Sequence, residues 1–430
     1  MKIASLLTVL SCLFFFPVAG HGGDAPPLSD GLPAALQYTI ALHPSIKSKL
    51  EELSALGFDL EAAKSSRYPT LGVQGNTNSR LSGPVSETND QYNNVLAVAK
   101  QPLWTGGRIE GGINQATVKQ KIGTLALLDV QRQLMESTVA TYAAILGDRK
   151  RLEAATLNVH EHERLQTLIS RRASGGIASE ADIQLANSRL SLAIAQRLQL
   201  EATLLRTQND LLALTQQGIP AVEQVPVNLT ELPATDGIAA DVEKISATVQ
   251  QRLVEVELAR IATDLATADM MPTLYAMMEQ DLYTSTADGE IPQGNRVGVV
   301  LEGNIEGLGL SGWKRVKSSE ARVGVAKKNV ESARNDVRRQ VQGLLTDLHS
   351  QQLVLQSNEL LVQSTEKTLN SFMRQYDAGR KSWVDVLNTQ RELSDARLNL
   401  EQTRSALLVT KLRLAVQCGQ FDLLAGVAAL

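Results

Sequence analysis

The best candidates in this sequence for a metal or acid–base site are two histidines, His160 and His162, in VHEHER. They stand two positions apart on a predicted helix, where residues i and i+2 point in different directions. The HExxH spacing of a zinc site is absent. GGRIEGG and EGLGLSG lack the lysine of a phosphate loop, and no Ser/His/Asp or Cys/His pair stands out. The sequence therefore predicts a protein that is not an enzyme and has no cofactor and no metal.

A turn that occurs twice carries the other notable polar residues. RRASGGIASEADIQLANSRL and RQYDAGRKSWVDVLNTQREL place a glycine, a serine and an aspartate at the same relative positions, 203 residues apart: Gly176, Ser179 and Asp182, then Gly379, Ser382 and Asp385. A glycine suits the left-handed position that ends a helix. A serine followed three positions later by an acidic residue forms a capping box at the start of the next helix. We therefore predict two helical hairpin tips, near 174–182 and 376–385.

The same offset relates Leu50 to Leu253 and Pro69 to Pro272, which indicates an internal duplication. The first repeat covers 21–218 and the second 241–420, with a proline-bearing linker at 219–240 and a C-terminal tail at 421–430. Each repeat is predicted to contain a helix, two strands, a long helix, a tight turn and a return helix.

The helices must be long rods. Proline-free stretches at about 117–174 and 316–377 predict the two long helices, which exceed any ordinary globular domain. In the second return helix, apolar residues recur at every seventh position: Val386, Leu393, Leu400, Leu407 and Leu414. This spacing is typical of coiled coils.

Four stretches of about ten residues are predicted to be strands: 70–82 and 295–306 alternate apolar and polar side chains clearly, and 92–104 and 273–284 do so less cleanly. Such strands suit a transmembrane barrel. Their polar faces hold candidate lumen residues: Arg80, Glu279, Asp281, Glu302 and Glu306. A solvated polar face explains these residues equally well. Four strands cannot close a barrel, whereas a homotrimer would supply 3 × 4 = 12.

The composition and the N-terminal residues indicate the cell compartment and the kinds of partner that the protein can have. Residues 1–20, with Lys2, an apolar run and small residues at Ala19 and Gly20, are typical of a secretory signal peptide. Its removal would leave Cys418 as the only cysteine, so we expect no intramolecular disulfide. The sequence VLS before Cys12 is a poor lipid-attachment box. The net charge of −4 argues against nucleic acid as a partner.

Several motifs, in this order, resemble the TolC family of outer-membrane channels: LHPSI, RYPTLGVQG, KQPLWTGGRIEGGINQA and YDAGRKSWVDVLNTQRELSDARLNLEQTR. The resemblance implies a mainly α fold with transmembrane β: a TolC-like homotrimer with a 12-stranded β-barrel (four strands per protomer) in outer-membrane lipid. A periplasmic α-helical coiled-coil barrel would extend from it. The implied partners are a periplasmic adaptor (a membrane fusion protein) and an inner-membrane ABC or other transporter. Type I secretion of large adhesin or RTX-type cargo is the function that the resemblance favours, and drug or small-molecule efflux is the alternative.

The resemblance also assigns roles at the hairpin tips. Asp385 matches an inward-facing aspartate whose three copies form an acidic ring at the entrance, and Asn388 replaces the second aspartate of that ring. Tyr376 and Lys381 match residues of closed-state gate contacts, with Asp182 as their carboxylate partner. A purely structural role remains open for each, because both aspartates could serve only as caps and Tyr376 could simply pack at the tip. A soluble periplasmic coiled-coil adaptor without a barrel is the competing class of protein.

Overall fold

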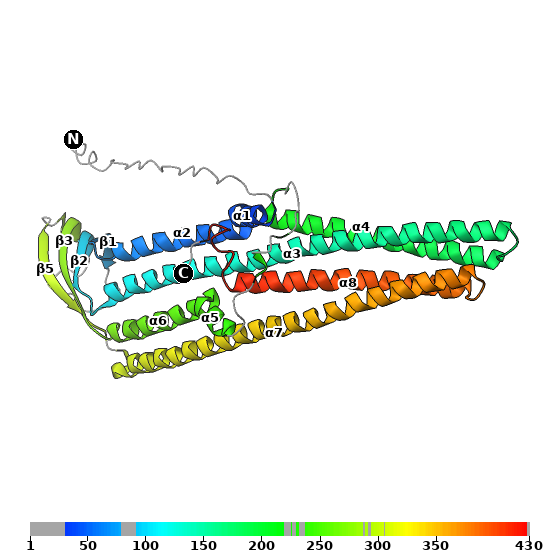
Figure 1. The fold of residues 1–430 in the computed structure, drawn as a ribbon. Helices are drawn as coiled ribbons and strands as arrows, with labels where there is room; N and C mark the ends of the chain where they lie inside the picture. The colour runs from blue at the N-terminus through cyan, green and yellow to red at the C-terminus, as the bar shows by residue number, and fades with distance from the viewer. Residues whose placement is uncertain are drawn as a thin grey trace.

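The computed structural model describes residues 31–78, 92–218, 225, 229–231, 237–286, 289–290, 294–304 and 306–427. The predicted signal peptide 1–20, Arg80 and most of the linker 219–240 lie outside these residues. The molecule is elongated, with a curved sheet at one end, helices along its length and two hairpin tips at the other end (Figure 1).

The two repeats have the same order of elements. The first consists of α1 (Leu32–Leu42), α2 (Pro44–Ser65), β1 (Thr70–Asn78), β2 (Tyr92–Trp104), α3 (Arg108–Ser174) and α4 (Glu180–Thr215). The second consists of α5 (Ile238–Ile245), α6 (Ala247–Ala268), β3 (Thr273–Thr286), β5 (Asn295–Glu302), α7 (Leu310–Asp377) and α8 (Trp383–Gln417). A two-residue strand, β4 (Gly289–Glu290), and a 3-10 turn, η2 (Glu306–Gly309), complete it. Helices α2 and α6 begin at residues 44 and 247, and α4 and α8 begin at 180 and 383, so each pair differs by 203.

The long helices α3 and α7 contain 67 and 68 residues, which corresponds to about 100 Å each at about 1.5 Å per residue. Both begin earlier than the sequence predicts, because Gly107 and Gly309 adopt positive φ at their N-caps and turn the chain from strand to helix. Gly111 lies inside α3 because a Cβ there would come within 2.6 Å of the Leu265 side chain on α6. No helix in the described part of the chain is long and apolar enough to cross a membrane.

The strands form one antiparallel sheet in the order β1-β2-β3-β5, with β4 pairing only with the end of β3. The central β2–β3 pairing joins the two repeats. The fourth strand is shorter than the predicted 295–306, since β5 ends at Glu302. The prediction of Glu306 in a strand is wrong: Glu306 begins η2, where positive φ at Gly307 and Leu308 turns the chain away from the sheet.

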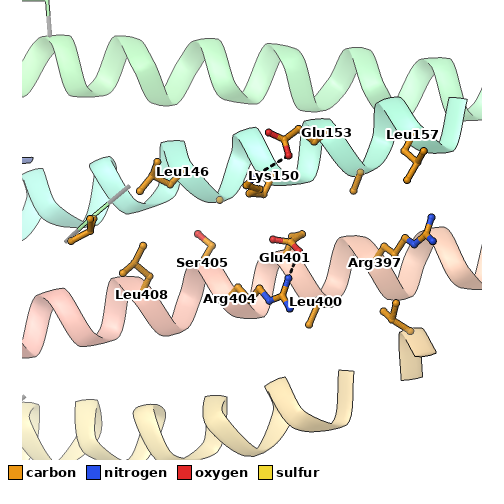
Figure 2. Close-up of a pocket in the computed structure, with 14 residues that line it drawn as sticks. Leu146, Lys150, Glu153, Leu157, Arg397, Leu400, Glu401, Arg404, Ser405 and Leu408 are labelled. Carbon is orange, nitrogen blue, oxygen red and sulfur yellow. Dashed lines mark hydrogen bonds and ion pairs between the residues drawn. The ribbon is translucent and has the colours of Figure 1, made fainter. Parts of the chain in front are cut away.

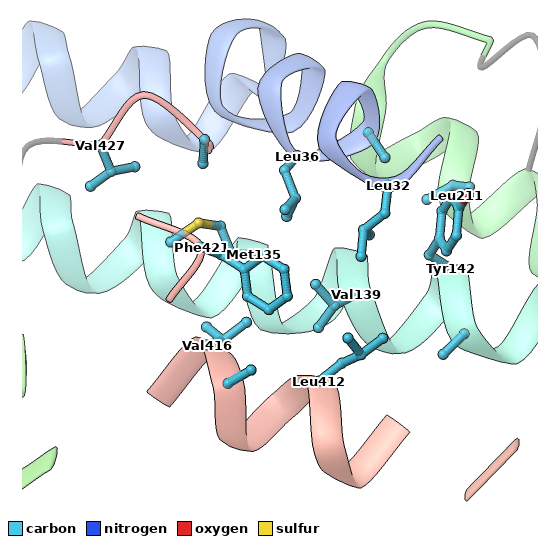
Figure 3. Close-up of a cluster of buried hydrophobic side chains, with 14 of the residues drawn as sticks. Leu32, Leu36, Met135, Val139, Tyr142, Leu211, Leu412, Val416, Phe421 and Val427 are labelled. Atoms are coloured by element: carbon cyan, nitrogen blue, oxygen red, sulfur yellow. The ribbon is translucent and has the colours of Figure 1, made fainter. Parts of the chain in front are cut away.

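A buried cluster halfway along the rods holds the C-terminal residues in place (Figure 3). Phe421 is fully buried with Tyr142, Met135 and Leu412, and Val427 lies at the edge of the same cluster. Beside it, Arg132 Nη2 donates to Asp422 Oδ2 at 2.6 Å, and both side chains are largely buried. The first part of the predicted tail 421–430 is therefore packed, because it covers the apolar junction between α1, α3 and α8.

Candidate functional site

The two hairpin tips have the same geometry. Gly176 and Gly379 both have φ of 72°, the left-handed conformation that glycine adopts without strain. Ser179 and Ser382 cap α4 and α8, and each lies in a complete capping box. In both boxes the serine Oγ donates to the aspartate Oδ2 at 2.8 Å, Asp182 in the first and Asp385 in the second.

Asp385 is held in its charged form. Hydrogen bonds from the Oγ and backbone N–H of Ser382 lower the pKa of the Asp385 carboxyl, and Lys381 adds a smaller effect, with its Nζ 3.7 Å from Oδ2. Asn388, one turn farther along α8, accepts a hydrogen bond of 3.4 Å from Arg189 of α4. The two predicted ring positions therefore differ: Asp385 interacts within its own hairpin, whereas Asn388 contacts the other hairpin.

The structure does not bring Asp182 to Tyr376 or Lys381, the partners that the family resemblance implies. The carboxylate of Asp182 is bound within its own capping box. Lys381 lies over the Phe372 ring, with Nζ 4.2 Å from the ring centroid, and Tyr376 packs on Trp383 with their ring centroids 5.3 Å apart. Within one protomer the contacts of Asp182 and Lys381 stay inside their own hairpins.

Arg172 makes the polar link between the two hairpins. Its Nη2 donates to Asp377 Oδ1 at 2.6 Å, and its guanidinium carbon lies 4.4 Å from the centroid of the Tyr376 ring. Beneath this link, Leu165 and Ile169 of α3 share an apolar cluster with Trp383 and other residues of α8. Sequence analysis missed Arg172, because it stands 205 residues from Asp377 and no local pattern relates the two.

A groove of about 780 Å³ runs between α3 and α8 near the middle of the rods (Figure 2). Gly147 and Ser405 both line it and lie directly against each other, so α3 and α8 approach closely at this point. Its charged side chains are all paired: Lys150 with Glu153, Arg404 with Glu401, and Arg397 with Glu366 outside the groove.

One face of the sheet carries charged side chains that pair across the strands. Arg296 on β5 contacts Glu279 at 3.0 Å and Asp281 at 3.1 Å on β3. Toward the helical end, Lys100 on β2 lies 3.1 Å from Glu302 on β5. The strand register places all five on the same face, so Glu279, Asp281 and Glu302 lie together as the alternation predicts. Arg80 lies outside the described residues.

The opposite face is apolar and exposed. Leu71 and Val73 on β1 are 83% and 71% exposed, and Val297, Val299 and Leu301 on β5 are 64–79% exposed. These two side chains on β1 and three on β5 form one surface with Ala97, Ala99 and Met278, which lie between them on β2 and β3. A sheet with paired charges on one face and open aliphatic side chains on the other is suited to lipid on its apolar side.

The histidines lie apart. His160 is exposed and 3.8 Å from Glu163, whereas His162 is 4% exposed and lies near Arg189 of α4. Burial, and secondarily the positive charge of Arg189, lowers the pKa of His162, so its imidazole is neutral at pH 7. Among the described residues, no three His, Cys, Asp or Glu side chains are grouped to hold a metal ion.

Residues 35–216 and 241–420 match the family model described as outer membrane efflux protein. The chain belongs to this family. The two matched ranges correspond to the two repeats. The resemblance to the TolC family of outer-membrane channels is therefore confirmed. Family membership places the chain in the outer membrane, with its helices extending into the periplasm, and supports a transport role, not an enzymatic one.

Solved structures confirm the fold. The chain is similar to CusC, with a TM-score of 0.79 and 15% identity over 91% of this chain and 92% of that one. It is similar to the outer-membrane channel OprN, with a TM-score of 0.75 and 16% identity over 90% of this chain and 89% of that one. The outer membrane protein VceC from Vibrio cholerae gives a TM-score of 0.73 and 17% identity over 90% of this chain and 96% of that one. The predicted fold class, mainly helical with four long antiparallel strands per chain, is therefore confirmed.

Proposed function

We propose that three copies of this chain form an export channel, with a 12-stranded barrel in the outer membrane and a helical tunnel in the periplasm. The supporting observation is the sheet: its apolar face is exposed, and its edge strands β1 and β5 have no further strand partner among the described residues. Open edges are not tolerated in lipid, so sister sheets must supply the missing partners. Three sheets of four long strands give 3 × 4 = 12.

The helices support the same assembly. In each protomer α4 packs on α3, α3 on α8 and α8 on α7, so α4 and α7 are the outer rods. Exposed leucines recur at seven-residue spacing on both: Leu198, Leu205 and Leu212 on α4, and Leu353 and Leu360 on α7. This spacing is typical of a coiled-coil seam, and the α4 of one protomer can meet the α7 of the next.

The gate of this channel is at the hairpin tips. In the closed state the two hairpins of a protomer are held by Arg172 against Asp377 and Tyr376. Asp182, Tyr376 and Lys381 contribute contacts between subunits, and three copies of Asp385 with Asn388 surround the entrance. An ion pair and a cation–π contact at a partly exposed site are together worth about 1–2 kcal/mol, or about a five- to thirty-fold shift between closed and open states.

Conductance of the purified protein in planar bilayers tests the channel and the gate. The wild-type protein should give small conductance steps, and Arg172→Ala should raise the open-channel population about five- to thirty-fold. Arg171→Ala is the matched control, since Arg171 is the neighbouring residue in α3 and is exposed. Asp182→Ala tests the contact between subunits separately. An Arg172→Ala protein that conducts like Arg171→Ala would remove Arg172 from the gate, and no conductance from any variant would refute the channel.

For the cargo we propose type I secretion of large adhesin or RTX-type proteins, through a periplasmic adaptor and an inner-membrane ABC transporter. The support is the resemblance of the chain to type I secretion members of the family, together with the poor lipid box before Cys12. Small-molecule efflux is the second candidate, favoured by the description of the matching family as efflux proteins. Deletion of the gene distinguishes them. Loss of a large protein from the culture medium with unchanged drug susceptibility supports secretion, whereas increased susceptibility with unchanged secretion supports efflux.

A further inference from the structure

The apolar face of the sheet ends in exposed aromatic residues where the strands pass into the helices. Trp104, the last residue of β2, lies opposite Leu274 after a register shift at Leu103, which directs it to the apolar face. Trp313 lies in the first turn of α7, and α7 begins at the end of the molecule that carries the sheet (Figure 1). Trp104 and Trp313 are 49% and 48% exposed, and Tyr68, just before β1, is 71% exposed.

Basic side chains accompany these aromatic rings. Lys314 Nζ lies 4.7 Å and Lys317 Nζ 6.0 Å from the centroid of the Trp313 ring. Arg67 is exposed next to Tyr68 and shares with Trp104 a hollow of about 350 Å³. Lys317 also pairs with Glu320 at 2.7 Å, whereas Arg67 and Lys314 make no ion pair among the described residues. We name these six residues the collar: Arg67, Tyr68, Trp104, Trp313, Lys314 and Lys317.

The collar lies at the boundary between the sheet and the helices, and this position indicates which part of the membrane surrounds it. The apolar face lies in the hydrocarbon of the outer membrane and the helices lie in the periplasm, so the collar lies at the headgroups of the periplasmic leaflet. Tryptophan and tyrosine favour this interface because one edge is apolar and the other accepts polar contacts. Unpaired lysine and arginine near a lipid surface favour anionic headgroups, because a zwitterionic headgroup carries its own compensating amine.

We propose that the collar binds anionic phospholipid selectively in the periplasmic leaflet, with Lys314 on the phosphodiester of a lipid beside Trp313 and Arg67 on that of a second lipid beside Trp104. The proposal rests on the outer-membrane placement and is independent of cargo and gate. One unpaired cation at such a surface is expected to enrich anionic lipid about fivefold around Trp313.

The chain contains three tryptophans, Trp104, Trp313 and Trp383, so its fluorescence can be assigned by substitution. In Trp104→Phe/Trp383→Phe protein, only Trp313 emits. The protein is reconstituted in phosphatidylcholine vesicles that contain a small, equal fraction of either brominated phosphatidylglycerol or brominated phosphatidylcholine. Brominated phosphatidylglycerol should be enriched about fivefold at Trp313 and should quench it correspondingly more. A protein that retains only Trp383, which is 4% exposed at the hairpin tip, should be quenched by neither lipid.

Lys314→Gln/Lys317→Gln should abolish the difference between the two quenchers. Lys327→Gln/Lys328→Gln removes the same charge farther along α7 and should leave the difference intact. Wild-type protein extracted from mixed vesicles provides an independent measurement, because native mass spectrometry should find more phosphatidylglycerol than phosphatidylcholine bound to it. Equal quenching by both lipids, no quenching of Trp313, or the same bound-lipid ratio in wild type and Lys314→Gln/Lys317→Gln would each overturn the proposal.

Discussion

Val299→Arg tests whether the apolar face of the sheet contacts lipid. Val299 lies opposite Ala276 near the middle of β5 and is 64% exposed in the protomer. An arginine facing lipid costs about 2–4 kcal/mol at the bilayer midplane and less toward the interface, which amounts to at most about 6–12 kcal/mol in a trimer. That cost is comparable to the whole stability of an ordinary domain, about 5–15 kcal/mol. If the face were in water instead, the same substitution would change stability by only about 0.5 kcal/mol.

The assay is refolding from urea into lipid vesicles, read as the yield of the heat-sensitive trimer in gel electrophoresis. Val299→Arg should lower this yield sharply. Val300→Arg is the matched control, because the adjacent residue lies opposite Tyr275 on the polar face. A Val299→Arg protein that refolds as well as Val300→Arg would refute lipid contact at this face.

Two further predictions concern the helical rods. Because burial lowers the pKa of His162 below its ordinary value of about 6.5, the unfolded chain binds the proton more readily, and stability is lost as pH falls below about 6.5. The thermal midpoint of His162→Gln should therefore fall less between pH 8 and pH 5 than that of the wild type or of exposed His160→Gln, and equal slopes would contradict the assignment. Gly147→Ala should cost about 1–3 kcal/mol in chemical denaturation, because its Cβ would collide with Ser405. The second substitution Ser405→Gly should recover part of that loss, and an unaffected Gly147→Ala protein would contradict the close approach of α3 and α8.

Local chemistry made the hairpin tips predictable. A glycine at the left-handed position and a serine–aspartate capping box each depend on residues within a single turn, so the sequence contains the whole signal. The sheet faces were predictable for the same reason, since strict alternation fixes which side chains share a face. The duplication strengthened both, because each signal occurs at two places 203 residues apart.

Long-range packing explains what sequence analysis missed. The starts of α3 and α7 were placed too late because glycines such as Gly111 weaken a helix unless a neighbour requires close approach, and Leu265 is that neighbour. The link from Arg172 to Asp377 depends on how two hairpins from different repeats meet. Periodicity within either hairpin does not contain this information.

Cross-linking of the edge strands tests the central claim most directly. Cysteines placed on the same apolar face, at Leu71 or Val73 of β1 and at Val297, Val299 or Leu301 of β5, are introduced pairwise into a Cys418→Ser chain. Within one chain β2 and β3 separate these strands by about 14 Å, three strand spacings, which is too far for a disulfide. If β5 of each subunit pairs with β1 of the next, oxidation in membranes should give covalent dimers and trimers for at least one pair. Cysteines at Val73 and Met278, on β1 and β3, should give none. A complete set of β1–β5 pairs that yields only monomer would contradict a pore built from shared strands.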